Sequence, residues 1–309
     1  MALIDGYSHI YPENYLGKYA KHSPMISKMA SELKYLADVE GRIRFMDQLG
    51  IDREIISLAM PNLDDLNLPV KDTNEATQIS NDGICELAEN HQSRFVPIGT
   101  VSLQDPEFAV AESRRCLNEL GMKGIQIVSN VKGQHLGSPQ FEPFFNYMEQ
   151  SGKPVWLHPT FMRNTYGWLR EDAVDIMVGW DFDVTLALIK MMSSGLIRRH
   201  PKLKIIVHHL GSLLPILAGR ITSFLNSMDP NPETPLNWMK SLYVDTAEGM
   251  WMPWLKDGIE FFGLDHVLFG TDFPWGNSSN IISNLRSLDI PESKREKIIS
   301  GNISKLLGL

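Results

Sequence analysis

A (β/α)8 TIM barrel is the α/β fold that the sequence predicts, and three observations predict it. Short β-branched segments alternate with longer amphipathic segments along almost the whole chain. The alternation supplies eight β-then-α units, as many as a closed parallel barrel needs. A length of 309 residues is long for one ordinary domain but normal for this fold. We therefore expect a single barrel domain over residues 1–309.

The expected strands are short apolar runs bounded by turn residues. They fall at residues 1–10, 54–60, 94–103, 123–129, 154–159, 204–211, 241–247 and 266–274. Helices are expected where apolar residues recur at helical spacing. These segments lie around residues 42–49, 74–90, 106–120, 142–150 and 185–193, from 214 onward, and at 294–299 and 302–307. Gly50 and Gly121 follow two of the helices, at the position where glycine commonly ends a helix.

The strict alternation of strands and helices predicts parallel strands joined by right-handed crossovers. An open, doubly wound sheet is the rival architecture, but the sequence lacks the GxGxxG turn that would favour it. An irregular polar segment, residues 11–39, interrupts the alternation after the first strand. We expect this segment to be an insertion over the barrel mouth.

Composition narrows the class of protein. The chain is 43% hydrophobic and 21% charged, and 29 basic against 37 acidic residues give a net charge of −8. This balance argues against nucleic acid as a partner. Cys85 and Cys116 lack metal-type spacing, which predicts reduced, structural cysteines in a cytoplasmic protein. We expect neither a signal peptide nor a membrane anchor, since no apolar run approaches membrane-spanning length.

Polar side chains at the carboxyl ends of the strands indicate the chemistry, because a parallel barrel builds its active site there. They are Tyr7 and His9 on the first strand, His158 on the fifth, His208 and His209 on the sixth, and Asp272 on the eighth. A single histidine at a strand end is usually structural. Imidazoles and a carboxylate converging from several strands instead suit Zn²⁺ or a similar divalent ion, with positions left for water and substrate.

Aromatic and cationic side chains near these strand ends point to the substrate. The candidates are Phe161, Arg163, Trp168 and Trp275. Packing within a loop is the simpler interpretation for any one of them. Together, aromatic walls with an occasional arginine suit a planar anion. We therefore expect a small carboxylic acid, aromatic or conjugated.

The order of the motifs resembles the amidohydrolase superfamily. The chain has Asp5-x-x-x-His9 on the first strand, His158 on the fifth, His209-x-Gly on the sixth and GTDFP on the eighth. The strings RIRFMDQLGID, GIQI, HPKLKIIVHHLGSLLPILAGRI and a closing GN…LLGL are similar to one branch. That branch contains aminocarboxymuconate-semialdehyde decarboxylase and benzoate-type decarboxylases.

The resemblance implies roles for particular residues. His9, His158 and Asp272 would be metal ligands, for Zn²⁺ or alternatively Mn²⁺ or Fe²⁺, and Asp272 would keep some base character. His209 would be the acid/base, chosen over His208 by its spacing to Pro215 and Arg220. Arg220 would reach the substrate carboxylate of a neighbouring subunit, which implies a homodimer.

The first strand departs from the family pattern. Tyr7 stands where the superfamily usually carries histidine, or glutamate in some decarboxylases. A phenol with a pKa near 10 is a poor ligand unless a metal helps to deprotonate it. Tyr7 could ligate as phenolate, could border a weaker site with three ligands, or could fill the metal's place in a metal-free pocket. In the last case Tyr7 and His209 would still supply a proton and a hydrogen-bonded anchor.

The function expected from the resemblance is decarboxylation, with His209 handling the proton delivered to carbon as CO₂ leaves. Two other classes stay open. A hydrolase or hydratase on the same scaffold would use the same ligands to activate water for attack on an ester, lactone, amide or unsaturated acid. A non-catalytic descendant would explain the missing histidine at Tyr7, although it would have no need to keep the other site residues together.

Overall fold

The computed structural model describes residues 2–21, 23–162, 167–228, 235–247 and 249–309. Its barrel strands form two sheets in which every neighbouring pair runs parallel. One sheet has the order β1 (Ile4–Ile10), β2 (Arg53–Leu58), β3 (Phe95–Pro97). The other has the order β11 (Val267–Leu268), β10 (Tyr243–Asp245), β9 (Ile205–Val207), β8 (Val155–His158), β5 (Ile125–Val128), β4 (Gly99–Thr100).

The two sheets are parts of one barrel. Only Ile98 separates β3 from β4, so both belong to the single strand expected at residues 94–103. At the other edge, β1 pairs with the chain that follows β11. Gly6 N donates to Phe269 O at 2.7 Å, and His9 N donates to Phe273 O at 2.8 Å. Eight strand positions therefore close into a ring, which confirms the predicted (β/α)8 fold.

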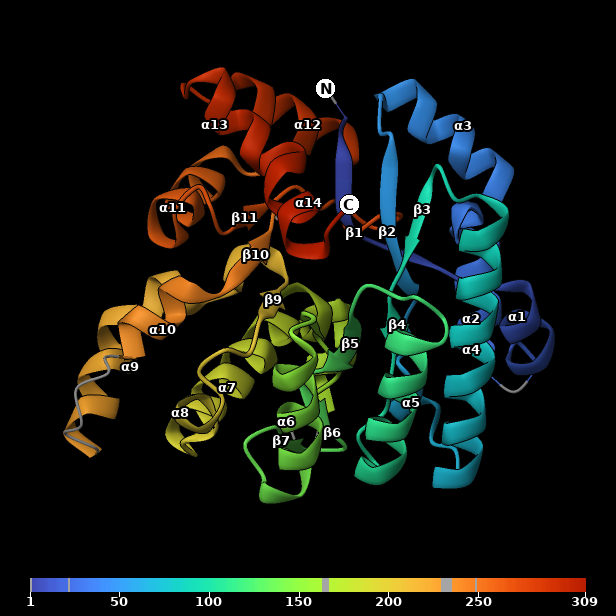
Figure 1. Cartoon of the computed structure of the whole chain (residues 1–309), viewed down its shortest axis with the longest axis horizontal. Coiled ribbons are helices and arrows are strands. Elements are labelled where there is room, and N and C mark those ends of the chain that lie inside the picture. Colours follow the sequence, from blue (N-terminus) through green and yellow to red (C-terminus); the bar gives the residue numbers. More distant parts are fainter. Residues whose placement is uncertain (1, 22, 163–166, 229–234, 248) are drawn as a thin grey trace.

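Helices surround the strands (Figure 1). The main ones are α3 (Val39–Leu49), α4 (Val70–Asn90), α5 (Pro106–Asn118), α6 (Glu142–Ser151), α7 (Trp180–Ser193), α9 (Leu214–Met228), α11 (Met252–Phe262), α12 (Ser278–Ser287) and α14 (Asn302–Leu307). Shorter ones are α8 (Leu196–Arg199), α10 (Pro235–Ser241) and α13 (Glu292–Glu296). A two-stranded antiparallel ribbon, β6 (Asn130–Val131) and β7 (Gln134–His135), follows β5. Gly50 ends α3 in the left-handed conformation, with φ +73°, as its position in the sequence predicts.

The predicted insertion 11–39 begins at the carboxyl end of β1 and contains α1 (Glu13–Tyr19), α2 (Pro24–Glu32) and a 3₁₀ turn, Lys34–Leu36. It leaves the mouth end of the barrel and packs against α4, beside which α1 and α2 lie in Figure 1. A hydrogen bond from Tyr11 N to Leu36 O, 2.7 Å long, ties its two ends together. That residues 1–309 form a single domain stays a prediction.

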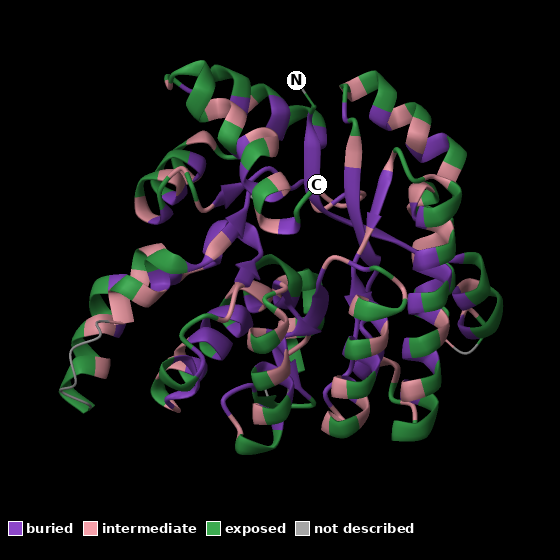
Figure 2. Ribbon diagram, viewed as in Figure 1, coloured by how far each residue is buried: buried purple, intermediate pink, exposed green. Residues whose placement is uncertain are grey.

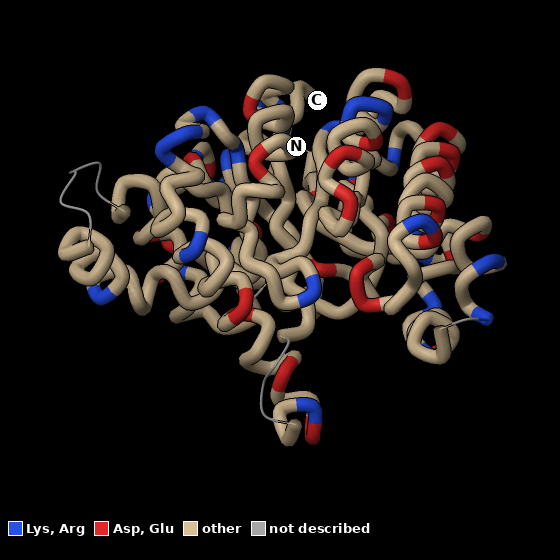
Figure 3. Tube along the Cα trace, turned by 90° about the horizontal axis from the view of Figure 1, so that it is seen from below, with Lys and Arg blue, Asp and Glu red and all other residues tan. Residues whose placement is uncertain are grey.

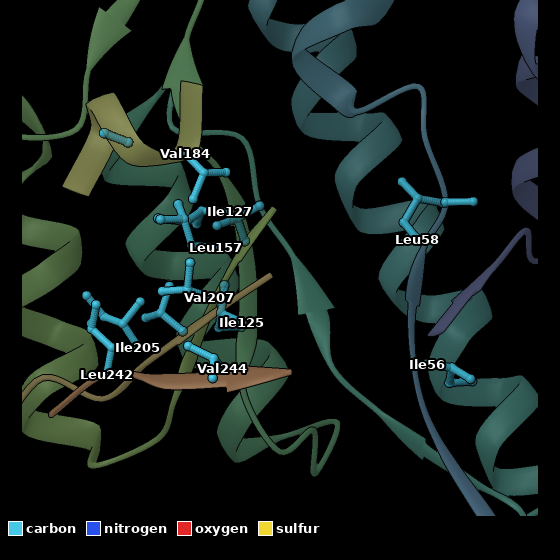
Figure 4. Packing of buried hydrophobic residues seen from close by; sticks show 14 of the residues in the cluster. Ile56, Leu58, Ile125, Ile127, Leu157, Val184, Ile205, Val207, Leu242 and Val244 are labelled. Carbon is cyan, nitrogen blue, oxygen red and sulfur yellow. The ribbon is translucent and has the colours of Figure 1, made fainter. Parts of the chain in front are cut away.

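Alternation along the strands divides the core into two layers. The barrel interior holds Ile4, Tyr7, Ile55, Val96, Ile98, Trp156, Ile206 and Leu268. The opposite faces of the same strands pack against the helices, as Figure 4 shows for Ile127 and Leu157 near Val184 of α7. The strands are accordingly buried and the helices half-buried (Figure 2). Because side chains alternate in a strand, His158 lies on the interior side with Trp156, and His208 with Ile206.

The outer surface carries the charge. Acidic and basic positions are interspersed over the helices and loops (Figure 3).

Cys85 and Cys116 are buried free thiols, as expected. Among the described helices, none combines the length and the apolar character that crossing a bilayer requires.

Candidate active site

The predicted site residues of the first, fifth, sixth and eighth strands meet at the carboxyl end of the barrel. The ring centroids of His9 and His158 are 5.1 Å apart, and those of His158 and His208 are 5.5 Å apart. His9 Nε2 lies 3.0 Å from Asp272 Oδ1. Residues distant in sequence thus form one buried cluster.

His9 is held from three sides. Its Nδ1 lies 3.0 Å from the Ser57 hydroxyl oxygen of β2. Its backbone carbonyl accepts a hydrogen bond from the buried Arg42 guanidinium, whose Nε lies 2.5 Å from Glu54 Oε2. The Arg42 guanidinium also stacks over the ring of Phe273, at 4.9 Å. The helix α3 that precedes β2 therefore fixes the backbone that carries His9.

Asp272 sits on a turn whose backbone is strained. Its φ is +56°, a region that residues other than glycine rarely adopt, and its N–H donates to Tyr7 O at 3.1 Å. Burial disfavours the charged carboxylate. The contact with His9 Nε2 and the nearby imidazoles of His9, His209 and His208 outweigh burial and hold the pKa of Asp272 below its ordinary value. Asp272 is therefore an anion at neutral pH.

Asp5 links the first strand to the residue before Asp272 through hydrogen bonds to its carboxyl group. Its carboxylate accepts hydrogen bonds from Tyr7 N at 3.1 Å, from Thr271 N at 3.0 Å and from the Thr271 hydroxyl. Burial and the charge of Glu54 raise the pKa of Asp5 well above its ordinary value. Asp5 thus ties β1 to the chain before Asp272, the structural role that the first-strand motif allows.

One ring nitrogen of His158 is engaged by the backbone. Its Nδ1 contacts the carbonyl oxygen of Pro159, so this nitrogen carries the hydrogen and Nε2 keeps its lone pair. Burial, together with the neighbouring His9 and His208, lowers the pKa of His158 well below its ordinary value. A neutral imidazole with a free Nε2 is the form that binds metals.

The Tyr7 hydroxyl turns to the barrel interior. It donates to Gln126 Oε1 at 2.6 Å. Burial and the charges of Asp272 and Asp245 raise the pKa of Tyr7 well above 10. The side chain is therefore a protonated phenol engaged with Gln126. Its catalytic role stays a prediction.

His208, not only His209, belongs to the cluster. The His208 ring packs against the Tyr7 ring with centroids 3.4 Å apart, and its Nδ1 lies 2.5 Å from Asp245 Oδ2. Its Nε2 is buried and has no hydrogen-bond partner among the described residues. Burial lowers the pKa of His208 well below its ordinary value and raises that of Asp245 to about 6. β9 ends at Val207, so both histidines lie in the segment that follows the strand.

His209 begins a 3₁₀ turn instead of continuing the strand. Its φ is +57°, and its Nδ1 lies 2.8 Å from Asp181 Oδ1 of α7. Its backbone N–H donates to Asp245 Oδ1 at 3.2 Å. This backbone geometry turns the His209 side chain toward α7. The charge of His209 still helps to lower the pKa of Asp272.

Whether the cluster suits a metal depends on its donor atoms. His9 Nε2 is buried and poorly aligned for a hydrogen bond with Asp272, although the two atoms are 3.0 Å apart. An unsatisfied nitrogen facing a carboxylate, with His158 Nε2 nearby, is chemically suited to a divalent cation. In their present orientations, no three described His, Cys, Asp or Glu side chains enclose an ion. The chemistry of these donor atoms fits such an ion.

Of the other predicted residues, some lie beside the site and others lie at the protein surface. Trp275 packs edge-on against His9, with ring centroids 5.4 Å apart. Phe161 lies beside Trp180, with centroids 6.0 Å apart. Trp168 is 56% exposed. Arg220 is exposed on α9, over the ring of Phe224. The prediction for Arg163 lies outside the described residues.

Three residues next to the site were not predicted from the sequence: Asp245, Asp181 and Trp180. The end of the seventh strand, where Asp245 lies, could have been searched like the ends of the other strands. No comparable signal marks Asp181 or Trp180, because both lie at the start of a helix. Trp180 packs 6.4 Å from the His158 ring, and its buried indole N–H has no partner among the described residues.

Comparison with known proteins gives consistent matches. The family model described as Amidohydrolase matches residues 34–309. The chain is 27% identical to 2-amino-3-carboxymuconate-6-semialdehyde decarboxylase of Dictyostelium discoideum, over 99% of this chain and 91% of the relative. It is 28% identical to a gamma-resorcylate decarboxylase of Polaromonas sp., over 89% of each chain.

Solved structures agree on the fold. 5-Carboxyvanillate decarboxylase from Sphingomonas paucimobilis superposes with a TM-score of 0.90, at 21% identity, covering 100% of this chain and 99% of the other. A dihydroxybenzoic acid decarboxylase from Polaromonas sp. superposes with a TM-score of 0.84, at 26% identity, covering 100% and 97%. That structure holds manganese and the inhibitor 2-nitroresorcinol. These four proteins are named as decarboxylases, which confirms the expected branch and gives no support to a hydrolase, a hydratase or a non-catalytic descendant.

Proposed function

Since the chain belongs to the amidohydrolase family, we propose that it is a decarboxylase, a carbon–carbon lyase, acting on a small aromatic or conjugated carboxylic acid. One observation carries the proposal: His9, His158 and an ionised Asp272 lie together at the barrel mouth, with a carboxylate-paired histidine, His209, close by. This set combines a cation site with an acid/base, the two functions that removal of a carboxylate from an sp² carbon requires.

In the reaction the bond between the carboxylate carbon and the substrate carbon breaks. Its electron pair stays on the substrate carbon, which takes up a proton as CO₂ leaves. His209 is the proposed proton donor in its imidazolium form, with Asp181 accepting from Nδ1 and the transferred proton leaving from Nε2. Trp275, Phe161 and Trp180 supply aromatic walls for a planar substrate.

The metal assignment follows from the donor atoms. We propose that His9, His158 and Asp272 hold one divalent ion, Zn²⁺, Mn²⁺ or Fe²⁺. When bound, such an ion orients and polarises the anionic substrate. The manganese in a related decarboxylase supports this class of ion. Tyr7, engaged with Gln126, borders the site, which favours the three-ligand alternative over the phenolate.

A homodimer is the proposed assembly. On α9, the side chains of Ile216, Phe224 and Met228 are 65%, 57% and 74% exposed, and they recur with Arg220 at four-residue spacing along one face. An apolar stripe of this kind on a surface helix marks an interaction site. A second copy covering it would bury Phe224 and carry Arg220 toward the partner's site. A cytoplasmic location stays a prediction.

A product assay tests the function. Purified protein is supplied with Zn²⁺ or Mn²⁺ and offered gamma-resorcylate, 5-carboxyvanillate, 6-methylsalicylate and 2-amino-3-carboxymuconate-6-semialdehyde in turn. We expect CO₂ release, with a matching decarboxylated product, from at least one of them. The proposal fails if these acids are untouched while esters, lactones or amides are hydrolysed.

Elemental analysis tests the metal. Wild type and a Tyr7→His variant are purified identically, without chelator or added metal. Near one equivalent of metal per chain in the wild type supports His9, His158 and Asp272 as a working site. An empty wild type beside a filled Tyr7→His variant means that Tyr7 disables the site, and metal-independent chemistry then replaces the metal proposal.

A further inference from the structure

Two carboxylates from different elements engage His209. Asp181 of α7 meets its side chain, with Oδ1 2.8 Å from Nδ1. Asp245 of β10 accepts from its backbone N–H at 3.2 Å and from Ala247 N at 3.0 Å. The backbone is therefore fixed from the strand side of the barrel, and the imidazole ring is fixed from the helix side.

The helix turn that carries Asp181 is also anchored to the segment after His209. Thr185 Oγ1 donates to Asp181 O at 2.7 Å and accepts from Leu213 N at 3.1 Å. Asp181 and the His209 turn thus belong to one hydrogen-bonded unit. The distance between the carboxylate and the ring is set by the backbone of both segments, and not by the two side chains alone.

We propose that Asp181 is a positioning residue that fixes the ring orientation and the tautomer of His209. The inference rests on the proposed function, in which His209 delivers the proton to carbon. A carboxylate that accepts the Nδ1 hydrogen leaves Nε2 as the atom that exchanges protons with the substrate. Without it, the imidazole can rotate and can carry its hydrogen on either nitrogen.

A purely structural ion pair would behave differently. The Asp181 side chain is 24% exposed and that of His209 is 9% exposed, and a partly exposed pair contributes little to stability. Loss of Asp181 is therefore expected to leave the protein folded. Its effect should appear in the chemical step, where the orientation of His209 matters.

The experiment compares Asp181→Asn, Asp181→Glu, His209→Asn and the double variant Asp181→Asn/His209→Asn. The substrate is the acid that gives CO₂ in the product assay. We expect Asp181→Asn to lower kcat by about 10- to 100-fold with KM within about twofold of wild type, and Asp181→Glu to recover part of the loss. In the His209→Asn background, Asp181→Asn should have no further effect, because its action passes through His209.

The pH profile supplies a second kinetic readout. Removing the negative charge at Asp181 lowers the pKa of the His209 imidazolium, so the kcat profile should move to lower pH. His208 and Asp272 also lie near this ring, Asp245 accepts from the backbone N–H of His209, and all three remain unchanged in the comparison. Exposed Glu171, replaced by glutamine, is the control for the loss of one negative charge.

A spectroscopic readout does not depend on activity. In protein with ¹⁵N-labelled histidine, the wild type should show the His209 signal with its hydrogen on Nδ1, identified by its loss in His209→Asn. This signal should become a mixture in Asp181→Asn. A normal kcat in Asp181→Asn, an unchanged tautomer, or additive losses in the double variant would overturn the inference. A near-normal rate in His209→Asn, with the tautomer shift intact, would instead overturn the acid/base role in the proposed function.

Discussion

The titratable side chains of the site differ in the direction in which their surroundings shift the pKa. Burial lowers the pKa values of His158 and His208, whereas at Asp272 the neighbouring His9 outweighs burial and lowers the pKa of the carboxyl group. A carboxylate anion beside neutral imidazoles is the protonation state in which these side chains bind a metal cation. The buried, unpartnered nitrogens of His9, His208 and Trp180 show where the described protein leaves polar atoms for a ligand to satisfy.

Replacing His209 by asparagine tests the proton donor. Asparagine keeps the polarity of the side chain but cannot deliver a proton. We expect the rate of CO₂ release to fall by about 10²- to 10⁴-fold in steady-state kinetics. Circular dichroism should show an unchanged fold, since Asp245 binds the backbone and not the ring of His209. A rate near that of the wild type would contradict the assignment.

Trp180→Phe tests the unpartnered indole. The substitution keeps an aromatic ring beside His158 and Phe161 but removes the N–H donor. If that N–H donates to the substrate, KM should rise by roughly tenfold, equivalent to about 1.4 kcal/mol, while kcat changes less. The control is Trp251→Phe, at a tryptophan that is 69% exposed. Equal KM values in wild type and Trp180→Phe would show that the N–H makes no bond to substrate.

Among the secondary-structure elements, β1 does the most to organise the molecule. It carries Tyr7 and His9, and it closes the barrel against the segment after β11 through backbone hydrogen bonds and the carboxylate of Asp5. At Gly6 the two backbones approach so closely that a Cβ would lie 2.8 Å from Phe269 O. Glycine is required there by this contact and not by its own dihedral angles.

A pair of glycine-to-alanine substitutions tests this closure. Gly6→Ala forces β1 away from Phe269, and we expect a loss of about 1–3 kcal/mol in the free energy of unfolding together with reduced activity. The matched control, Gly17→Ala, lies in α1, where a Cβ would have no neighbour within 4 Å. It should stabilise the helix by up to about 1 kcal/mol. Denaturant unfolding measures both, and equal stabilities would contradict the account of the closure.

For the whole molecule, buried acids set the dependence of stability on pH. Burial raises the pKa values of Asp5, Asp183, Asp64 and Asp245, the last two to about 6. Between the unfolded pKa near 3.9 and the folded value, the folded protein binds more protons than the unfolded chain. The contribution of Asp64 and Asp245 to stability is therefore complete below about pH 4 and is lost as the pH rises through about 6.

Asp64→Asn isolates one of these groups. Asp64 Oδ1 accepts from the Ser102 hydroxyl at 2.8 Å, a bond that an amide oxygen can keep. We expect the free energy of unfolding to fall less between pH 5 and pH 7.5 in the variant than in the wild type. Urea unfolding at both pH values measures the difference, with exposed Asp257→Asn as the control. Parallel pH profiles in all three proteins would refute the role of Asp64.

The assembly is also a property of the whole molecule. Phe224→Asp places a charge in the centre of the exposed α9 stripe, between Arg220 and Met228. In sedimentation velocity we expect the wild type to be a dimer and the variant a monomer, with lower activity because Arg220 no longer reaches a partner. Glu107→Lys, on the exposed part of α5, is the control for a surface charge change. A monomeric wild type would reject the dimer.

The sequence by itself determined the barrel, its strand segments, and the placement of His9, His158 and Asp272 at one mouth. Period-two and helical patterns are local, and parallel connectivity brings the strand ends together without further information. Only the tertiary structure decided that the Tyr7 hydroxyl meets Gln126, that His208 pairs with Asp245, and that Asp181 holds His209. These contacts depend on where a strand ends and on how a helix packs against it, and both are settled by side-chain packing between segments far apart in the chain.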